Sequence, residues 1–155
     1  MSELQTIFVT GIGVFALIGF IKGMHETWTK KNPFGITYVY RSLGAFVWAD
    51  MTVFGIFWLA AVAVSLLFSD WILFLLTASI FWLVRSIGET IYWLNQQFSP
   101  INRNPVKNFK HLKKMYHNDA VWFVYQIFWQ CMTVVFALTS IYLANLWLEF
   151  LNPSA

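Results

Sequence analysis

The sequence contains one cysteine, Cys131, and few charged residues, since Asp, Glu, Lys and Arg together make up 11% of its 155 residues. A single cysteine excludes a disulfide framework within the chain and a cysteine-rich zinc site. Soluble globular domains carry roughly 25% charged residues, so the composition also argues against an ordinary soluble domain. In place of charge the chain has 59% hydrophobic and 20% aromatic residues. This composition predicts an integral membrane protein.

Catalytic and cofactor-binding motifs are missing as well. The sequence has no G-x-S-x-G, no Walker A loop and no G-x-G-x-x-G. No histidine lies within a long apolar run, which excludes bis-histidine haem b inside a bilayer. His25, His111 and His117 lie between these runs and lack H-E-x-x-H or a comparable ligand spacing. We therefore expect a protein that is not an enzyme and that uses no metal or cofactor.

Four apolar runs approach or exceed the ~20 residues needed to cross a ~30 Å hydrocarbon core. They cover residues 4–23, 44–68, 71–94 and 121–150. Only Ser69 and Asp70 separate the second run from the third, which predicts an antiparallel hairpin. The predicted fold class is all-α, an integral membrane four-helix bundle that forms a single domain over residues 1–155.

The first run is expected to be a retained span rather than a secretory signal. Glu3 is the only charge that precedes it, so a basic n-region is missing, and no A-x-A cleavage site follows Gly23.

Basic residues concentrate in the two long connections between the runs. They are Lys30, Lys31 and Arg41 in the first connection, and Arg103, Lys107, Lys110, Lys113 and Lys114 in the second, while Lys22 ends the first run on the side of the first connection. The charged residues of the 69–70 turn and of the two ends of the chain are all acidic: Glu3, Asp70 and Glu149. This asymmetry predicts that both long connections are cytoplasmic and both termini outside, in the plasma (inner) membrane of a bacterium or archaeon. It also accounts for the net charge of +3 without nucleic-acid binding.

The second connection contains a short amphipathic pattern over residues 105–117. Asn104 can cap a helix and Pro105 suits its first position. Apolar residues then recur at three- and four-residue steps, and basic residues occupy the rest of the helical wheel: Lys107, Lys110, Lys113 and Lys114. The pattern predicts an interfacial helix on the inner leaflet. Its basic residues either bind anionic lipids or serve only as a topological anchor.

Polar residues also occur inside the runs. Counted inward from each cytoplasmic boundary, five of them fall about 7–14 Å deep at 1.5 Å per residue: Asp50, Arg85, Glu89, Gln126 and Gln130. Arg85 and Glu89 are four residues apart and can pair on one helix face. Charged groups at such depth face the bundle interior or water and often mark ion pathways. The five residues are therefore predicted to form one intramembrane polar layer.

Two functions are compatible with this layer. The first is a channel or transport module, acting as a homo-oligomer or within a membrane complex, in which Asp50 and Glu89 exchange a small ion or proton while Arg85 neutralises them. The second is an accessory or assembly subunit of a larger complex, in which the polar residues fix helix packing. A more distant alternative is a membrane enzyme for lipid or isoprenoid substrates that uses His25, His117 and Asp119.

Overall fold

The computed structural model describes residues 1–99 and 120–152. The described residues form four long helices, α1 (Glu3–Met24), α2 (Trp48–Leu67), α3 (Trp71–Phe98) and α4 (Ala120–Leu151), and contain no β-strand. All four helices are long and apolar enough to cross a membrane, which confirms the predicted all-α class for the described residues and four helices suited to the predicted spans. The predicted interfacial helix at 105–117, with Lys107, Lys110, Lys113 and Lys114, lies outside the described residues.

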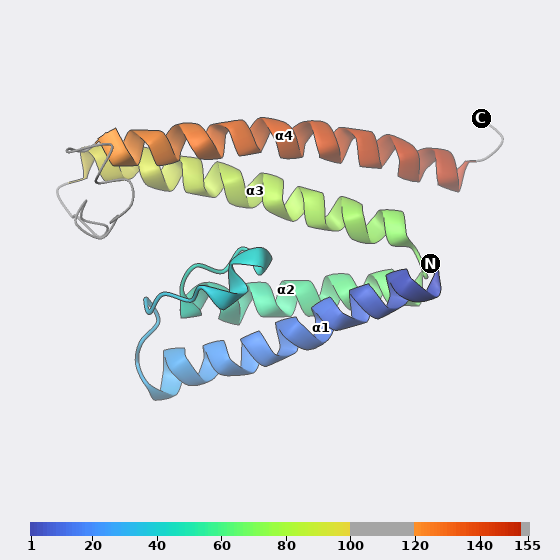
Figure 1. Ribbon diagram of the computed structural model, residues 1–155, viewed down its shortest axis with the longest axis horizontal. Coiled ribbons are helices and arrows are strands. Elements are labelled where there is room, and N and C mark those ends of the chain that lie inside the picture. The colour runs from blue at the N-terminus through green and yellow to red at the C-terminus, as the bar shows by residue number, and fades with distance from the viewer. Residues whose placement is uncertain (100–119, 153–155) are drawn as a thin grey trace. The chain divides into compact units, whose positions relative to one another are not determined.

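The chain divides into two compact units, residues 1–77 and 78–155, and the boundary falls inside α3. In the first unit α1 and α2 form an antiparallel pair (Figure 1). Small residues on α1 allow this close approach, because Gly13, Gly19 and Gly23 are all buried. A Cβ added at Gly13 would lie 2.9 Å from a methyl group of Val62 on α2. Small residues at helix contacts are characteristic of membrane helix pairs.

The turn between α2 and α3 is as short as the sequence predicts. Ser69 adopts a left-handed conformation with φ of 50°, and the Oδ1 atom of Asp70 accepts a hydrogen bond of 3.0 Å from the backbone N–H of Leu73. The first turn of α3 then packs back on the hairpin, where the ring of Phe74 lies 6.5 Å from that of Phe8 and 6.4 Å from that of Trp58.

The connection between α1 and α2 has a fold that the sequence pattern did not indicate. After a π-helical turn, His25–Thr29, residues 33–47 fold back against α1 and α2 and include a 3₁₀ helix, Val39–Leu43. We call residues 33–47 the arm. Figure 1 shows this cyan segment beside the N-terminal part of α2. Its two limbs are joined by a 2.9 Å hydrogen bond from the Thr37 N–H to the Phe46 carbonyl. The second helix consequently begins at Trp48, not at the predicted residue 44.

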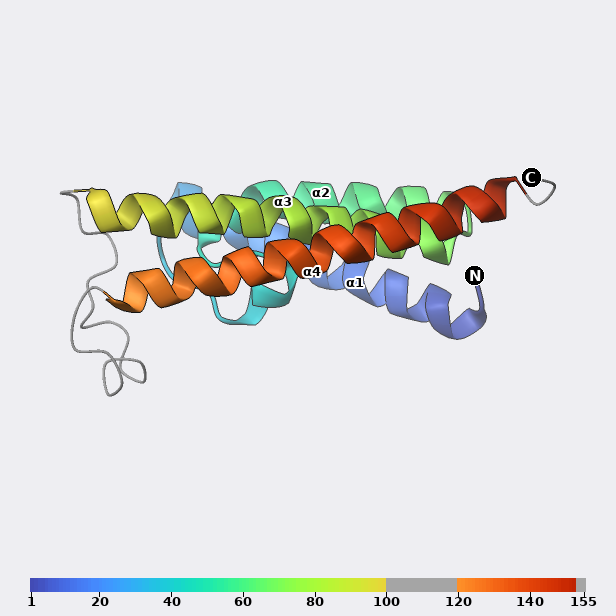
Figure 2. The ribbon, with the colours of Figure 1, turned by 90° about the horizontal axis from the view of Figure 1, so that it is seen from above.

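In the second unit α3 and α4 run side by side and cross at a shallow angle (Figure 2). The third helix extends to Phe98, four residues beyond the predicted span end at 94. Its last turn is held in place by the Gln97 amide, which donates to the Trp93 carbonyl at 3.2 Å and to Oε1 of Gln126 on α4 at 2.7 Å.

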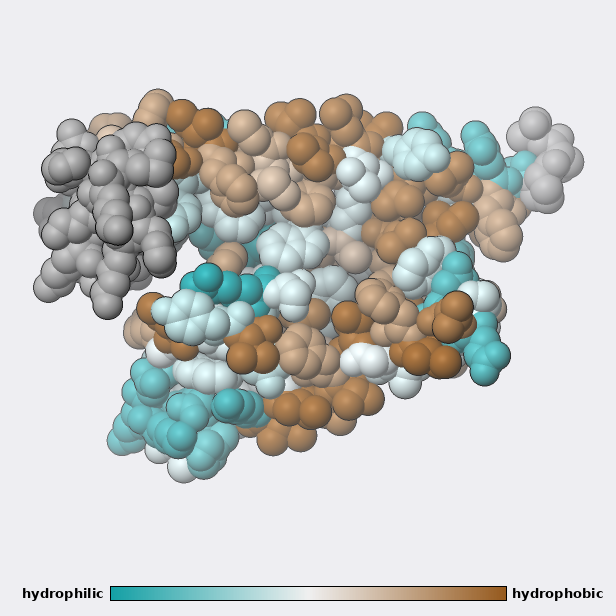
Figure 3. Space-filling view, viewed as in Figure 1, coloured by the Kyte–Doolittle hydropathy of each residue, from teal (hydrophilic) through white to brown (hydrophobic). Residues whose placement is uncertain are grey.

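The surface has the distribution expected of lipid-exposed helices. Apolar side chains cover the visible faces of α1 and α4, and hydrophilic residues gather near the end of α1 (Figure 3). Large apolar residues are freely exposed along α1 and α4, among them Ile18, Ile21, Val134 and Leu138 at 54–64%. In water this exposure would be unfavourable, whereas in a bilayer these side chains are solvated by acyl chains. The four helices thus indicate a membrane protein.

Candidate functional site

An ion pair between Arg85 and Glu89 lies on α3. An Nη atom of Arg85 is 2.8 Å from Oε1 of Glu89, and the two side chains are only 17% and 11% exposed. The second carboxylate oxygen of Glu89 accepts a hydrogen bond of 3.0 Å from the indole N–H of Trp93. Because each carboxylate oxygen has its own donor, the buried charge is well compensated. The predicted i, i+4 pair is therefore present.

The pair lies deeper in its helix than the sequence boundaries implied. Arg85 is 14 residues after Trp71 and 13 before Phe98, so it sits at the midpoint of a helix about 42 Å long at 1.5 Å per residue. Glu89 is about 13 Å from the C-terminal end of the helix by the same measure. A guanidinium group in the middle of a spanning helix is too far from either end for snorkelling to place it fully in the headgroups.

Beside this pair, α3 and α4 meet along a polar seam. Ser79 shares a 2.9 Å hydrogen bond with Ser140, and the hydroxyl of Thr133 donates to that of Ser86 at 3.1 Å. Ser79 and Ser86 are seven residues apart on one helix, as are Thr133 and Ser140 on the other. A seven-residue repeat of small residues is the pattern of an antiparallel helix pair with coiled-coil packing.

Aromatic stacks fill the seam between the hydroxyl contacts. The rings of Trp82 and Phe136 stack at 5.8 Å with an interplanar angle of 18°, and those of Trp93 and Tyr125 stack at 4.7 Å and 18°. The stack on Trp93 orients its indole, which is the group that donates to Glu89. The seam therefore supports the ion pair as well as joining the two helices.

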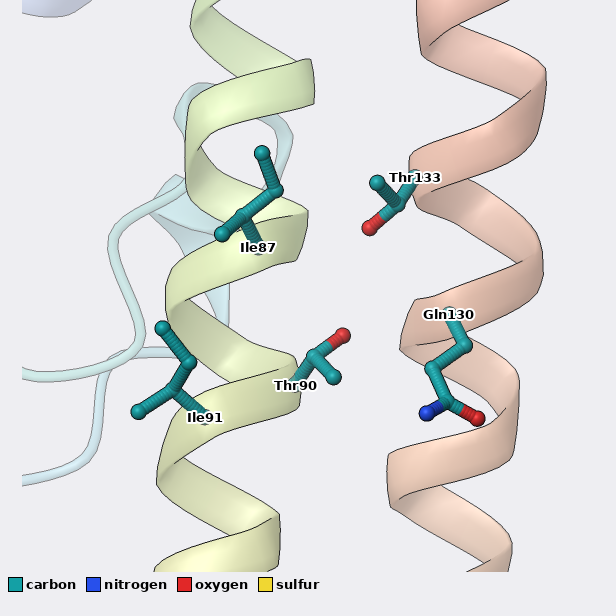
Figure 4. Close-up of a pocket in the computed structure, with 5 residues that line it drawn as sticks. All are labelled: Ile87, Thr90, Ile91, Gln130 and Thr133. Carbon is teal, nitrogen blue, oxygen red and sulfur yellow. The ribbon is translucent and has the colours of Figure 1, made fainter.

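Gln126 and Gln130 have different surroundings although both were predicted for the same layer. Gln126 joins the seam through the amide of Gln97. Gln130 is exposed and borders a shallow groove of about 170 Å³ between the two helices. Figure 4 shows Gln130 and Thr133 on α4 opposite the other lining residues, Ile87, Thr90 and Ile91, on α3. The groove is mainly apolar apart from these short polar side chains.

Asp50 belongs to the first unit and lies at the start of α2. It is the third residue of that helix, whereas the predicted span, starting at residue 44, placed it six residues beyond the span's first residue. Its Oδ2 atom accepts hydrogen bonds from the backbone N–H groups of Phe46 and Val47 at 3.0 and 3.3 Å. Asp50 therefore ties the end of the arm to α2, and its negative charge is favourable at a helix N-terminus. That the five predicted residues share one layer stays a prediction.

Replacing Asp50 with alanine is expected to lower the free energy of unfolding by about 0.5–2 kcal/mol, the range measured for lost helix caps. Asn at this position keeps an oxygen that accepts from the two N–H groups, so Asp50→Asn should retain most of the stability. Unfolding of the purified protein in mixed micelles, followed by tryptophan fluorescence, measures the difference. Equal losses in the two variants would contradict the capping role.

Both sides of the seam carry a spacing signal in the sequence. Gln126, Thr133 and Ser140 recur at helical spacing among apolar residues, which marks a contact face. The recurrence of Ser79 and Ser86 at seven residues was the corresponding signal on α3.

Among the histidines, only His25 lies within the described residues, and it forms no recognisable site there. His25 is exposed in the π-helical turn, while His111, His117 and Asp119 lie outside the described residues. Within residues 1–99 and 120–152, no group of three His, Cys, Asp or Glu side chains is arranged to hold a metal ion.

Comparisons with protein-family models, curated proteins and solved structures found no match to this chain.

Proposed function

We propose that this protein is a non-enzymatic polytopic membrane protein that conducts or couples a small ion through polar side chains within its spanning helices. The observation that carries the proposal is the Arg85–Glu89 pair, held at the middle of an apolar helix at 2.8 Å. A charged side chain near the bilayer centre is unfavourable by at least ~2.5 kcal/mol on insertion scales. Such groups are retained most often where an ion or proton passes.

The ion path is proposed to form between protomers. Four helices of this size enclose little space, and the seam between α3 and α4 is filled by hydroxyls and stacked rings. Self-association, or insertion into a larger membrane complex, would place the exposed Gln130 and the groove beside it against another chain. Polar side chains on membrane helices promote this kind of association.

The proposed location is the plasma (inner) membrane of a bacterium or archaeon, with both long connections in the cytoplasm and both termini outside. The charge asymmetry supports this orientation. The interfacial helix proposed at residues 105–117 would bring Lys107, Lys110, Lys113 and Lys114 to anionic lipids.

The second candidate is an accessory or assembly subunit of a membrane complex, in which the polar residues act only in packing. The observation that favours it is that the main polar groups pair within the chain. Arg85 and Glu89 neutralise each other within one helix, and Asp50 caps α2.

Ion flux through the purified protein in liposomes distinguishes the two candidates. We expect the Asp50→Asn, Glu89→Gln double variant to lose most of the flux, because it removes both acids while keeping hydrogen-bonding capacity. Glu26→Gln is the matched control, since Glu26 pairs with Lys30 in the connection at 2.6 Å. Unchanged flux in the double variant would contradict the proposed role of Asp50 and Glu89 in ion conduction. An absence of flux in the wild type would favour the second candidate, an accessory or assembly subunit.

A further inference from the structure

The arm reaches far along the α1–α2 hairpin. The Leu43 carbonyl, at the tip of the arm, accepts a hydrogen bond of 3.0 Å from the indole N–H of Trp58. The ring of Tyr40 lies 4.8 Å from that of Phe15, and a Cβ added at Gly19 would lie 2.8 Å from the Tyr40 ring. The arm is therefore anchored to the sides of both helices and not to their ends.

These contacts give the depth of the tip. Trp58 is ten residues into α2, about 15 Å, and Phe15 is nine residues before the end of α1, about 14 Å. Allowing for the reach of the side chains, the tip lies on the order of 10 Å beyond the first residue of α2. Because the 20 residues of α2 match the thickness of the hydrocarbon core, this depth is inside the membrane.

The arm has one buried and one exposed face. Thr37, Tyr40, Leu43 and Ala45 are at most 4% exposed, and they pack on the hairpin. The arm exposes the polar side chains of Tyr38, Arg41 and Ser42, and beside them the apolar side chains of Phe34, Ile36 and Val39. The guanidinium group of Arg41 lies 4.5 Å from the centre of the Tyr38 ring. No carboxylate of the described residues forms an ion pair with Arg41.

Two physical constraints limit what can cover this face. Non-helical backbone at membrane depth is tolerated only where it is buried in protein or lines a water-filled cavity, and an intramembrane arginine needs water or a partner. Hydration of the arm meets both constraints.

We propose that residues 33–47 form a re-entrant arm whose exposed face lines a water-filled path, and that Arg41 makes this path selective for small inorganic anions. Rings of arginine or lysine side chains are the usual basis of anion selectivity in pores. The carboxylate nearest to Arg41 in the sequence belongs to Asp50. It accepts hydrogen bonds from two backbone N–H groups and therefore compensates the positive charge of Arg41 less. The inference rests on the proposed function and names the charge class of the ion.

The charge bias that sets the orientation does not depend on Arg41. Without Arg41, basic residues still mark this side of the membrane, with Lys30 and Lys31 in the first connection and Lys22 at the end of the first run. The side of the membrane from which the arm enters is therefore unchanged.

Reversal potentials across planar bilayers under a KCl gradient test the selectivity. In Arg41→Gln, the chloride-to-potassium permeability ratio should fall on the order of fivefold or more. The attraction between two unit charges at contact distance, even in bulk water, changes the local concentration of an ion by about this factor. Arg41→Lys should keep the ratio. Lys31→Gln is the matched control, because it removes the same charge from an exposed position in the same connection.

The possible failures are distinct. If the wild type conducts no ion, the proposed function fails. If it conducts and Arg41→Gln has the wild-type permeability ratio, only the selectivity assigned to Arg41 is overturned.

Water access to the arm can be measured without any conduction. In a Cys131→Ala background, Ser42→Cys should react with a membrane-impermeant, anionic thiosulfonate in sealed vesicles of the orientation that exposes the basic connections. Ile56→Cys is the control, because Ile56 is 58% exposed on α2, about 12 Å from its start, and should remain unmodified in lipid. An unreactive Ser42→Cys would overturn the water-filled path.

Discussion

Replacing Arg85 with leucine is expected to lower the free energy of unfolding by about 3–5 kcal/mol, the range for removing one partner of a buried ion pair. The loss arises because Glu89, with a side chain only 11% exposed, would keep its charge after the guanidinium group 2.8 Å from its Oε1 atom is removed. Reversible unfolding in mixed micelles, followed by tryptophan fluorescence, measures it.

Two further variants separate the buried charge from general disruption of α3. The double variant Arg85→Leu, Glu89→Leu should return to within about 1–2 kcal/mol of the wild type, because apolar replacements of buried pairs are often neutral or stabilising. Glu26→Gln breaks another i, i+4 pair, but the Lys30 side chain that it leaves behind is 55% exposed, so the loss should stay below about 1 kcal/mol. An Arg85→Leu effect as small as that of Glu26→Gln would contradict the burial of the pair.

The same variants bear on function. If the Arg85→Leu, Glu89→Leu variant is as stable as the wild type and still conducts, the pair is dispensable for stability and for conduction. A packing role in an accessory subunit then becomes the better explanation. If it is stable and does not conduct, the pair is retained for the ion path. The comparison is informative because it separates the contribution of the charges from the stability of the fold.

The sequence predicted the four helices because their signal is local. Length and hydropathy decide whether a segment can span a membrane, and both are properties of consecutive residues. The short turn at Ser69 and Asp70 was equally visible. The spacing of Gln126, Thr133 and Ser140 along α4 is a signal of the same local kind.

The arm could not be predicted in the same way. Its position depends on contacts with residues far away in the sequence, since Tyr40 packs on Gly19 and the Leu43 carbonyl accepts from Trp58. Counting from Gly44 therefore placed Asp50 six residues into the span, whereas it lies in the first turn of the helix that begins at Trp48. Within the sequence, Pro33 and the glycines at both limbs of the arm, Gly35 and Gly44, were the only local signals of a turn.

The second large effect is expected at Gly55, where α1 and α2 are closest. A Cβ added there would lie 2.7 Å from the Cβ and 3.2 Å from the Cα of Phe20, and a backbone atom cannot move aside as a flexible side chain can. Gly55→Ala should therefore lower the free energy of unfolding by about 1–3 kcal/mol, the range for overpacked cores. Unfolding in mixed micelles measures the loss.

Gly11→Ala is the matched control for this substitution. A Cβ at Gly11 meets nothing within 4 Å, so the same added methyl group should be neutral or should stabilise α1 by up to about 1 kcal/mol through helix propensity. Equal effects at the two glycines would contradict the tight hairpin. The consequence extends to the arm, because Met51, which contacts Gly55, also contacts Gly19 beneath Tyr40. Separating the helices at Gly55 should therefore loosen the arm and change the reactivity of Ser42→Cys, whereas Gly11→Ala should not.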